Sequence, residues 1–200
     1  MRRTQHQRPD AGESHLVDAR HSVLNFDPAL LIRAKGVRIV FFDVDGVLTD
    51  GGLYLSAQGE TLKRFNTLDG HGIRLLQKAG VVPAVITGRD SPALRLRLEA
   101  LGITNAHFGT EDKRSAAEKT LEALCLSWSD AAAMGDDWPD LPVMRRCAFS
   151  TAPPHAHAEV KAIAHHLTKA AAGHGAVREL CDLLLTATGH YANLLADYAQ

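Results

Sequence analysis

Short apolar runs alternate with longer amphipathic stretches along most of the chain, beginning with the run Val37–Phe42. Uninterrupted apolar residues, many of them β-branched or aromatic, are typical of strands buried on both faces of a sheet. We expect further strands at residues 81–86, 106–108, 131–134 and 147–150, and a last apolar stretch near 164–167. Amphipathic spacing predicts helices at 29–34, 70–79, 92–102, 114–126, 139–146, 157–162 and 177–185, with Asp69 as the cap of the second. This alternation predicts an α/β fold, a mostly parallel sheet with helices on both faces.

Residues 52–65 depart from this alternation. Two short runs, LYLS and ETLKRF, flank a turn at residues 57–59, which predicts a projecting β-hairpin. The hairpin is unusually apolar for an element that leaves the body of a small domain, since it carries Leu53, Leu55, Leu62 and Phe65. An apolar patch of this kind is often covered by a second chain.

Length and composition fit one globular domain. The chain has 200 residues, of which 46% are hydrophobic and 22% are charged. We expect a polar N-terminal tail over 1–25, a single domain over 26–188 and a C-terminal tail over 189–200. The N-terminal stretch carries positive charge without the apolar core of a secretory signal. No apolar run approaches the ~20 residues that cross a bilayer.

Charge and cysteine usage narrow the partners and the compartment. The formal net charge is −1, which gives no general attraction to nucleic acid or to an acidic membrane. The three cysteines are odd in number and lie in apolar surroundings, which favours a reducing, cytoplasmic location. The eleven histidines include no recognisable zinc-ligand framework, so they are expected to be ordinary surface residues.

Two carboxylates, Asp43 and Asp45, leave the first predicted strand together and are followed by Gly46. Like charges this close are unfavourable unless a cation lies between them, and Mg²⁺ is the hard ion that prefers oxygen ligands. The alternative is a pair of aspartates in an ordinary strand-end turn. Further polar residues follow the later strands: Thr87, Lys113, Asp136 and Asp137. Because ligands bind at the carboxyl ends of parallel strands, we expect these side chains to lie at one site.

Taken in order, these residues resemble the motifs of the haloacid dehalogenase superfamily of phosphohydrolases, over roughly residues 37–185. The resemblance implies a Rossmann-like sheet and a catalytic set of Asp43, Asp45, Thr87 and Lys113. Asp43 would be the nucleophile and Asp45 the acid and base. Mg²⁺ would be held by Asp43, Asp136 and the carbonyl of Asp45, with Asp137 and Asp140 holding metal-bound waters.

Many members of this superfamily cover the site with a cap domain inserted between motifs. Here Thr87 follows Asp43 by 44 residues and Lys113 follows Thr87 by 26, and predicted elements already fill both intervals. We therefore expect no cap domain. The substrate is then large, or a neighbouring subunit closes the site, and the apolar hairpin favours the second option.

The segments DVDGVLTDG, LKRFNTLDGHGI, ITGRD, GDDWPDLPVM and GAVRELCD resemble the 3-deoxy-D-manno-octulosonate 8-phosphate phosphatase family, which is capless and tetrameric. The resemblance implies hydrolysis of that small sugar-acid phosphate and a homotetramer in which a neighbour helps cover each site. It also implies substrate contacts, and guanidinium groups suit both the phosphate and the carboxylate of such a substrate. The implied contacts are Asp45, Asn66, Thr67, Leu68, Asp69, Gly70, Arg74, Gly88, Arg89, Arg97 and Lys113, with Arg64 as a weaker candidate.

Two positions depart from the family pattern, and two other readings stay open. Leu68 stands where many relatives have a basic residue, and His174 lies in a turn that is richer in glycine and arginine elsewhere in the family. Both departures concern the substrate more than the reaction. The chain could therefore act on another acid sugar phosphate, such as a nine-carbon sialic-acid-type 9-phosphate. A phospho-accepting receiver domain is the other alternative, but receivers carry the phospho-accepting aspartate on a middle strand.

Overall fold

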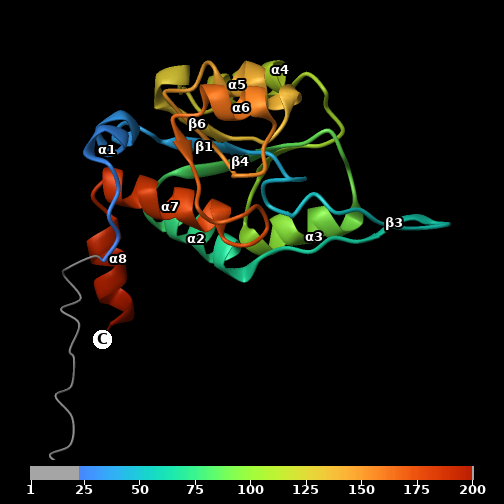
Figure 1. Ribbon diagram of the computed structural model, residues 1–200, viewed down its shortest axis with the longest axis horizontal. Coiled ribbons are helices and arrows are strands. Elements are labelled where there is room, and N and C mark those ends of the chain that lie inside the picture. The colour runs from blue at the N-terminus through green and yellow to red at the C-terminus, as the bar shows by residue number, and fades with distance from the viewer. Residues whose placement is uncertain (1–22, 200) are drawn as a thin grey trace, which may run out of the picture.

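A six-stranded parallel sheet forms the centre of the computed structural model, which describes residues 23–199 (Figure 1). The spatial order is β5-β4-β1-β6-β7-β8, and every neighbouring pair is parallel. The strands are β1 (Ile39–Phe42), β4 (Val82–Ile86), β5 (Asn105–His107), β6 (Ala131–Met134), β7 (Phe149–Ala152) and β8 (His166–Leu167). The chain winds from β1 outward to β5 and then from β6 outward to β8. The switch point between β1 and β6 is where sheets of this type bind ligands.

Helices cover both faces of the sheet (Figure 1). One face carries α1 (Pro28–Ala34), α2 (Thr67–Lys78), α3 (Pro92–Leu101) and α7 (Ala176–Ala187), with α8 (Tyr191–Tyr198) packed beside α7. The other face carries α4 (Lys113–Ala123), α5 (Leu141–Met144) and α6 (Ala158–Ile163), and the short 3-10 turns η1 (Trp128–Asp130) and η2 (Trp138–Asp140) flank β6. Within β1, Val40 and Phe42 belong to the first core while Phe41 belongs to the second, because side chains alternate along a strand.

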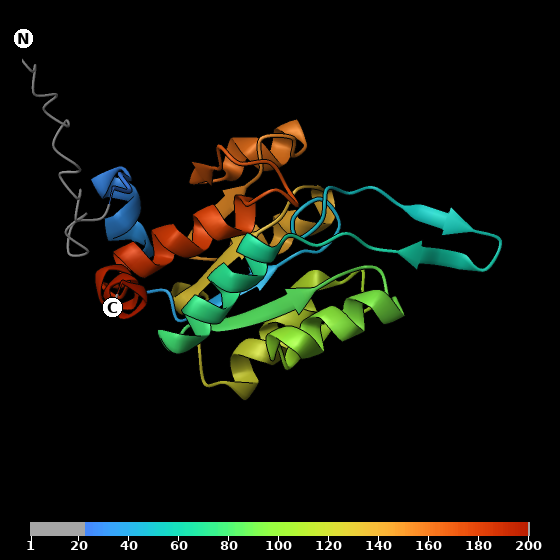
Figure 2. The same cartoon turned by 90° about the horizontal axis from the view of Figure 1, so that it is seen from below.

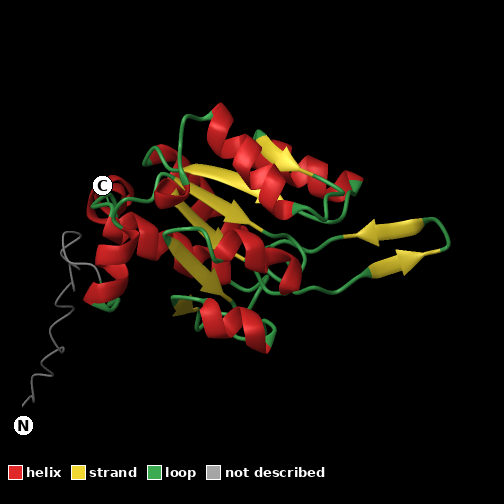
Figure 3. Cartoon of the chain, turned by 90° about the horizontal axis from the view of Figure 1, so that it is seen from above, coloured by secondary structure: helices red, strands yellow, loops and turns green. Residues whose placement is uncertain are grey.

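The hairpin of β2 (Tyr54–Ser56) and β3 (Gly59–Leu62) extends away from the body of the molecule, as Figures 2 and 3 show. All three residues of β2 are exposed. The side chains of Leu55 and Leu62 are 66% and 67% exposed, so this single chain does not cover the apolar surface of the hairpin.

The predicted α/β fold is confirmed, including the projecting hairpin and the absence of a cap among the described residues. Between β1 and β4 the chain forms only the hairpin and α2, and between β4 and α4 it forms only α3 and β5. The prediction that Asp69 caps α2 is wrong. Asn66 is the N-cap and accepts hydrogen bonds from the Leu68 and Asp69 amides at 2.8 and 3.4 Å.

The sequence predicts a tail at each end of the chain. Most of the expected tail over 1–25 lies outside the described residues. The segment 189–200, which we expected to be a tail, contains α8, because Tyr191 and Leu194 pack against the core beside α7. No helix within residues 23–199 has the length and apolar character to cross a membrane.

Candidate active site

The carboxyl ends of β1, β4 and β6 open into a polar cavity of about 770 Å³. It gathers the predicted side chains from four separate stretches of the chain. Its lining consists of Asp43, Asp45, Thr87, Gly88, Arg89, Thr110, Glu111, Lys113, Asp136, Asp137, Pro139 and Asp140. All four predicted catalytic residues and the three predicted metal ligands therefore lie at one site.

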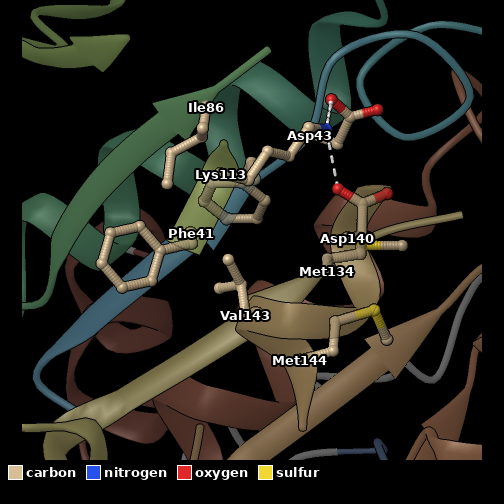
Figure 4. Close-up of a pocket in the computed structure, with 10 residues that line it drawn as sticks. Phe41, Asp43, Ile86, Lys113, Met134, Asp140, Val143 and Met144 are labelled. Atoms are coloured by element: carbon tan, nitrogen blue, oxygen red, sulfur yellow. Dashed lines mark hydrogen bonds and ion pairs between the residues drawn. The ribbon is translucent and has the colours of Figure 1, made fainter. Parts of the chain in front are cut away.

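Lys113, which lines this cavity, lies between the carboxylates of Asp43 and Asp140 (Figure 4). Its ammonium group donates to Asp43 Oδ1 at 2.6 Å and to Asp140 Oδ1 at 2.7 Å. The side chain is 6% exposed. Burial lowers the pKa of this amine, but Asp140 and Asp43 outweigh that effect and raise it above its ordinary value. Lys113 is therefore a fixed positive charge beside Asp43.

An apolar layer lies directly behind these ion pairs. Figure 4 shows Phe41, Ile86, Met134, Val143 and Met144 around the aliphatic part of Lys113. These five residues are 1–4% exposed, so the charges interact in a medium of lower polarity than bulk solvent. The same layer holds the lysine stem in one position, which aims its ammonium group at the carboxylates.

Asp43, Asp136 and Asp140 each place a carboxylate oxygen within 4.8 Å of the other two. Asp136 Oδ1 is buried and has no hydrogen-bond partner within the described part of the chain. A buried carboxylate oxygen without a donor is unfavourable unless a cation binds it. Three oxygen donors that include an unpaired one fit a hard divalent ion such as Mg²⁺.

The pKa values of these acids reflect the same crowding of negative charge. Burial raises the pKa of Asp136 to about 8, with further contributions from the charges of Asp43 and Asp140. Burial and the charge of Asp140 raise the pKa of Asp43 to about 6, although Lys113 acts in the opposite direction. A divalent cation at this position would favour the ionised forms, because an opposite charge stabilises a carboxylate.

Gly46 brings the loop after β1 against this cluster. Its φ of +87° is in the left-handed region, and a Cβ atom here would lie 2.1 Å from Asp136 Oδ2. Glycine is therefore required both by the backbone conformation and by the close approach to Asp136.

The Asp45 carboxylate pairs with Lys63 and Arg89 and is not one of the three clustered carboxylates. Its Oδ1 accepts a hydrogen bond from the ammonium group of Lys63, and its Oδ2 lies 3.7 Å from Arg89 Nε. The predicted role of Asp45 as a metal ligand involves its backbone carbonyl, so the direction of its side chain leaves that prediction open.

Thr87 and Gly88 form the turn after β4. Thr87 is 1% exposed, and its Oγ1 accepts a hydrogen bond from the Arg89 amide at 3.2 Å. The hydroxyl proton remains available to an oxygen atom in the cavity. The Arg89 side chain is 52% exposed at the rim.

The remaining predicted substrate contacts do not line this cavity. They are the residues of α2, its cap and α3, namely Asn66, Thr67, Leu68, Asp69, Gly70, Arg74 and Arg97, together with the weaker candidate Arg64 after β3. Asp69 is 1% exposed and accepts from the Arg178 amide at 2.8 Å, so its carboxylate caps α7. Burial raises the pKa of Asp69 despite these hydrogen bonds from α7.

Two arginines of this second group, in α2 and α3, contact backbone within their own chain. Arg97 Nη2 donates to the Asn66 carbonyl at 3.1 Å and packs where a side chain on Gly70 would have to lie. Arg74 Nη2 donates to the Ala100 carbonyl at 2.6 Å, near the end of α3 remote from the cavity. Within one chain, therefore, Arg74, Arg97 and residues 66–70 do not reach the cavity that Asp43 and Lys113 line.

Sequence reasoning missed four residues of the site, one of which is Pro139 of η2 at the cavity wall. Thr110 and Glu111 line the cavity from the loop before α4, and Lys63 contacts Asp45 from the hairpin. Nothing in the apolar pattern distinguishes these positions from ordinary loop or strand-end residues.

A Rossmann-like sheet without a cap, with an aspartate pair after β1 and Lys113 beside the first of them, defines a haloacid dehalogenase-like hydrolase. Residues 108–180 match the sequence profile of that group. The chain is also 41% identical over 160 residues to the 3-deoxy-D-manno-octulosonate 8-phosphate phosphatase of Escherichia coli K12, a match that covers 80% of this chain and 85% of that protein.

Solved structures agree with this comparison. A probable YrbI family phosphatase from Pseudomonas syringae has a TM-score of 0.84 at 43% identity, covering 86% of this chain and 97% of that one. The Moraxella catarrhalis 3-deoxy-D-manno-octulosonate 8-phosphate phosphatase, solved with magnesium, phosphate and KDO, has a TM-score of 0.82 at 33% identity, covering 85% and 98%. The chain belongs to the 3-deoxy-D-manno-octulosonate 8-phosphate phosphatase family.

Proposed function

We propose that this phosphatase hydrolyses 3-deoxy-D-manno-octulosonate 8-phosphate to the free sugar acid and phosphate, with Mg²⁺ as cofactor. The main support is the 41% identity to the Escherichia coli enzyme together with the cavity that joins Asp43, Lys113 and Asp136. The receiver alternative is not favoured, because the aspartate beside the buried lysine follows the first strand of the sheet.

In this proposal Asp43 attacks phosphorus through a carboxylate oxygen while the bond from phosphorus to the sugar oxygen breaks, which gives an aspartyl-phosphate. Asp45 gives a proton to the departing sugar oxygen. It then takes a proton from the water that attacks phosphorus and releases Asp43 and phosphate. Thr87, the amides near Gly88 and the Lys113 ammonium bind the phosphoryl oxygens. Asp43, Asp136 and the Asp45 carbonyl would hold Mg²⁺, which would neutralise part of the negative charge of the carboxylates and the phosphoryl group.

We further propose that the enzyme is a homotetramer in which a neighbouring subunit completes each site. Arg74, Arg97 and residues 66–70 lie outside the cavity of their own chain, and a neighbouring cavity would give them a substrate to bind. The uncovered apolar hairpin supplies the surface for such contacts.

We also propose that the enzyme is cytoplasmic, since Cys125, Cys147 and Cys181 are all free thiols.

Steady-state kinetics test the proposed reaction. We expect kcat/KM for the eight-carbon 8-phosphate to exceed that for a nine-carbon sialic-acid-type 9-phosphate by a clear margin. Phosphate release should require Mg²⁺ and should fall at least about 10³-fold in Asp43→Asn, which removes the nucleophile. A preference for the nine-carbon substrate would overturn the assignment of the sugar, and activity in Asp43→Asn would overturn the assignment of the nucleophile.

A further inference from the structure

Lys63, the residue that follows β3, buries its side chain although its immediate neighbours in the chain are exposed. Its side chain is 1% exposed, whereas Thr61, Leu62 and Arg64 on either side of it are exposed. A lysine is almost never fully buried unless its charge is paired. The burial of Lys63 therefore points to a specific electrostatic role.

The ammonium group of Lys63 lies between two carboxylates. It donates to Oδ1 of Asp45, and it lies 3.1 Å from Oε1 of Glu60 in β3. The Asp45 and Glu60 side chains are only 20% and 14% exposed, so solvent screens these pairs weakly. The cationic lysine thus fixes one oxygen of Asp45, while the Oδ2 atom faces Arg89 at 3.7 Å.

We propose that Lys63 is a positioning residue that holds the Asp45 carboxylate in the orientation needed for proton transfer to the leaving group. This inference rests on the proposed role of Asp45 as the acid and base. Lys63 occupies Oδ1 and leaves Oδ2 to carry the proton that moves to the sugar oxygen as the bond to phosphorus breaks. The negative charge of Glu60, 3.1 Å from the ammonium group, favours the charged form of the lysine without a hydrogen bond to it.

The contact between Lys63 and Asp45 makes the position of the hairpin matter for the reaction. Glu60 and Lys63 both belong to the segment that projects from the domain, whereas Asp45 belongs to the loop after β1. A displacement of the hairpin would move the ammonium group and release the Asp45 side chain. Misplacement of a reacting group by about 1 Å can lower a rate by about 10²-fold.

Two substrates with different leaving groups test the proposal. The sugar oxygen of 3-deoxy-D-manno-octulosonate 8-phosphate must be protonated as it departs, whereas the p-nitrophenolate of p-nitrophenyl phosphate departs without a proton. Since kcat/KM reports the steps up to leaving-group departure, we expect Lys63→Met to lower it about 10- to 100-fold for the sugar phosphate. The value for p-nitrophenyl phosphate should change by less than about threefold.

Further variants test whether the loss depends on the charge of Lys63 and on its position. Lys63→Arg keeps a positive charge and should regain several-fold of the lost kcat/KM for the sugar phosphate. Lys119→Met, at an exposed position of α4, should leave both substrates at the wild-type values. If Lys63→Met yields no folded protein, Lys63→Gln, which keeps a donor without the charge, is measured in the same way and is expected to show the same selective loss.

Each outcome decides the inference. Selective loss for the sugar phosphate supports it, whereas an equal loss for both substrates, or no loss, overturns it. Failure of the proposed function itself has a different signature, because wild-type protein would then lack Mg²⁺-dependent hydrolysis or Asp43→Asn would retain it.

Discussion

The backbone of Gly46 lies so close to Asp136 that a methyl group at this position would overlap the carboxylate. We expect Gly46→Ala to raise the Mg²⁺ concentration for half-maximal activity by about tenfold or more, as changes around metal ligands commonly do. The measurement is a Mg²⁺ titration of phosphate release. Gly36→Ala is the matched control, since a Cβ there meets no atom within 4 Å. Equal Mg²⁺ requirements in both variants would contradict the prediction.

Glu179 provides a pH-dependent contribution to stability remote from the cavity. Burial would raise its pKa, but hydrogen bonds from His166 and from the Lys169 and Ala170 amides lower it below the ordinary value. Because the folded pKa is lowered, the stabilisation is fully present above the pKa of the unfolded chain and is lost as pH falls through the lowered value.

The corresponding variant is Glu179→Gln, which keeps the shape of the side chain without its charge. The difference in free energy of unfolding between wild type and variant should be largest near neutral pH and should shrink in acid. Urea denaturation at several pH values measures it. A difference that is constant with pH would show that the charge makes no contribution.

Among single residues, the sequence predicted those whose position follows from where a strand ends. Asp43 and Thr87 come directly after apolar runs and Asp136 comes one glycine later, and parallel strands bring such ends to one edge. Lys63 could not be predicted in this way, because its contact with Asp45 depends on how the hairpin leaves the domain. Asp69 was assigned to the wrong helix because an aspartate near a helix start can cap another helix as well as its own.

Packing between α2 and the sheet stabilises the element that carries residues 66–70. Leu76 is fully buried in this core, whereas Leu96 on α3 is 67% exposed. We expect Leu76→Ala to lower the free energy of unfolding by about 2–5 kcal/mol, through lost burial and a residual cavity. Leu96→Ala should change it by about 0.5 kcal/mol or less. Chemical denaturation of both variants measures the two changes in the free energy of unfolding. If α2 is loosely packed, the two changes will be similar.

Periodicity located nearly every helix and strand, since each buries an apolar stripe or a complete apolar run. It was less informative for α8, whose side chains are only partly buried and whose position depends on contacts with α2 and α7. The ends of elements also depend on caps such as Asn66, which several neighbouring polar residues could have provided.

At the scale of the whole molecule, two inactive variants should restore each other if neighbours share a site. Asp43→Asn removes the nucleophile, and Arg74→Ala removes a proposed contact to the adjoining cavity. After the two are unfolded together and refolded in equal amounts, about a quarter of the sites should regain both groups in a symmetric assembly with random mixing. Activity toward the sugar phosphate measures the recovery. A mixture no more active than its components would place Arg74 in a site of its own chain or in none.

The proposed assembly can be inferred from the sequence only in outline. The apolar residues of the hairpin indicate that something covers them, and the intervals between motifs exclude an inserted cap. Neither observation specifies how many copies meet, because that number depends on the angles between surfaces and not on the pattern within one chain.

The exposed side chains of Leu55 and Leu62 have a further consequence for how the activity of such an enzyme depends on its concentration. If contacts at the hairpin complete the site, mass action links catalytic output per chain to the total amount of protein present. Dilution would then dissociate the subunits and inactivate the enzyme without unfolding it. A relative that carries its own cap would remain active as a monomer.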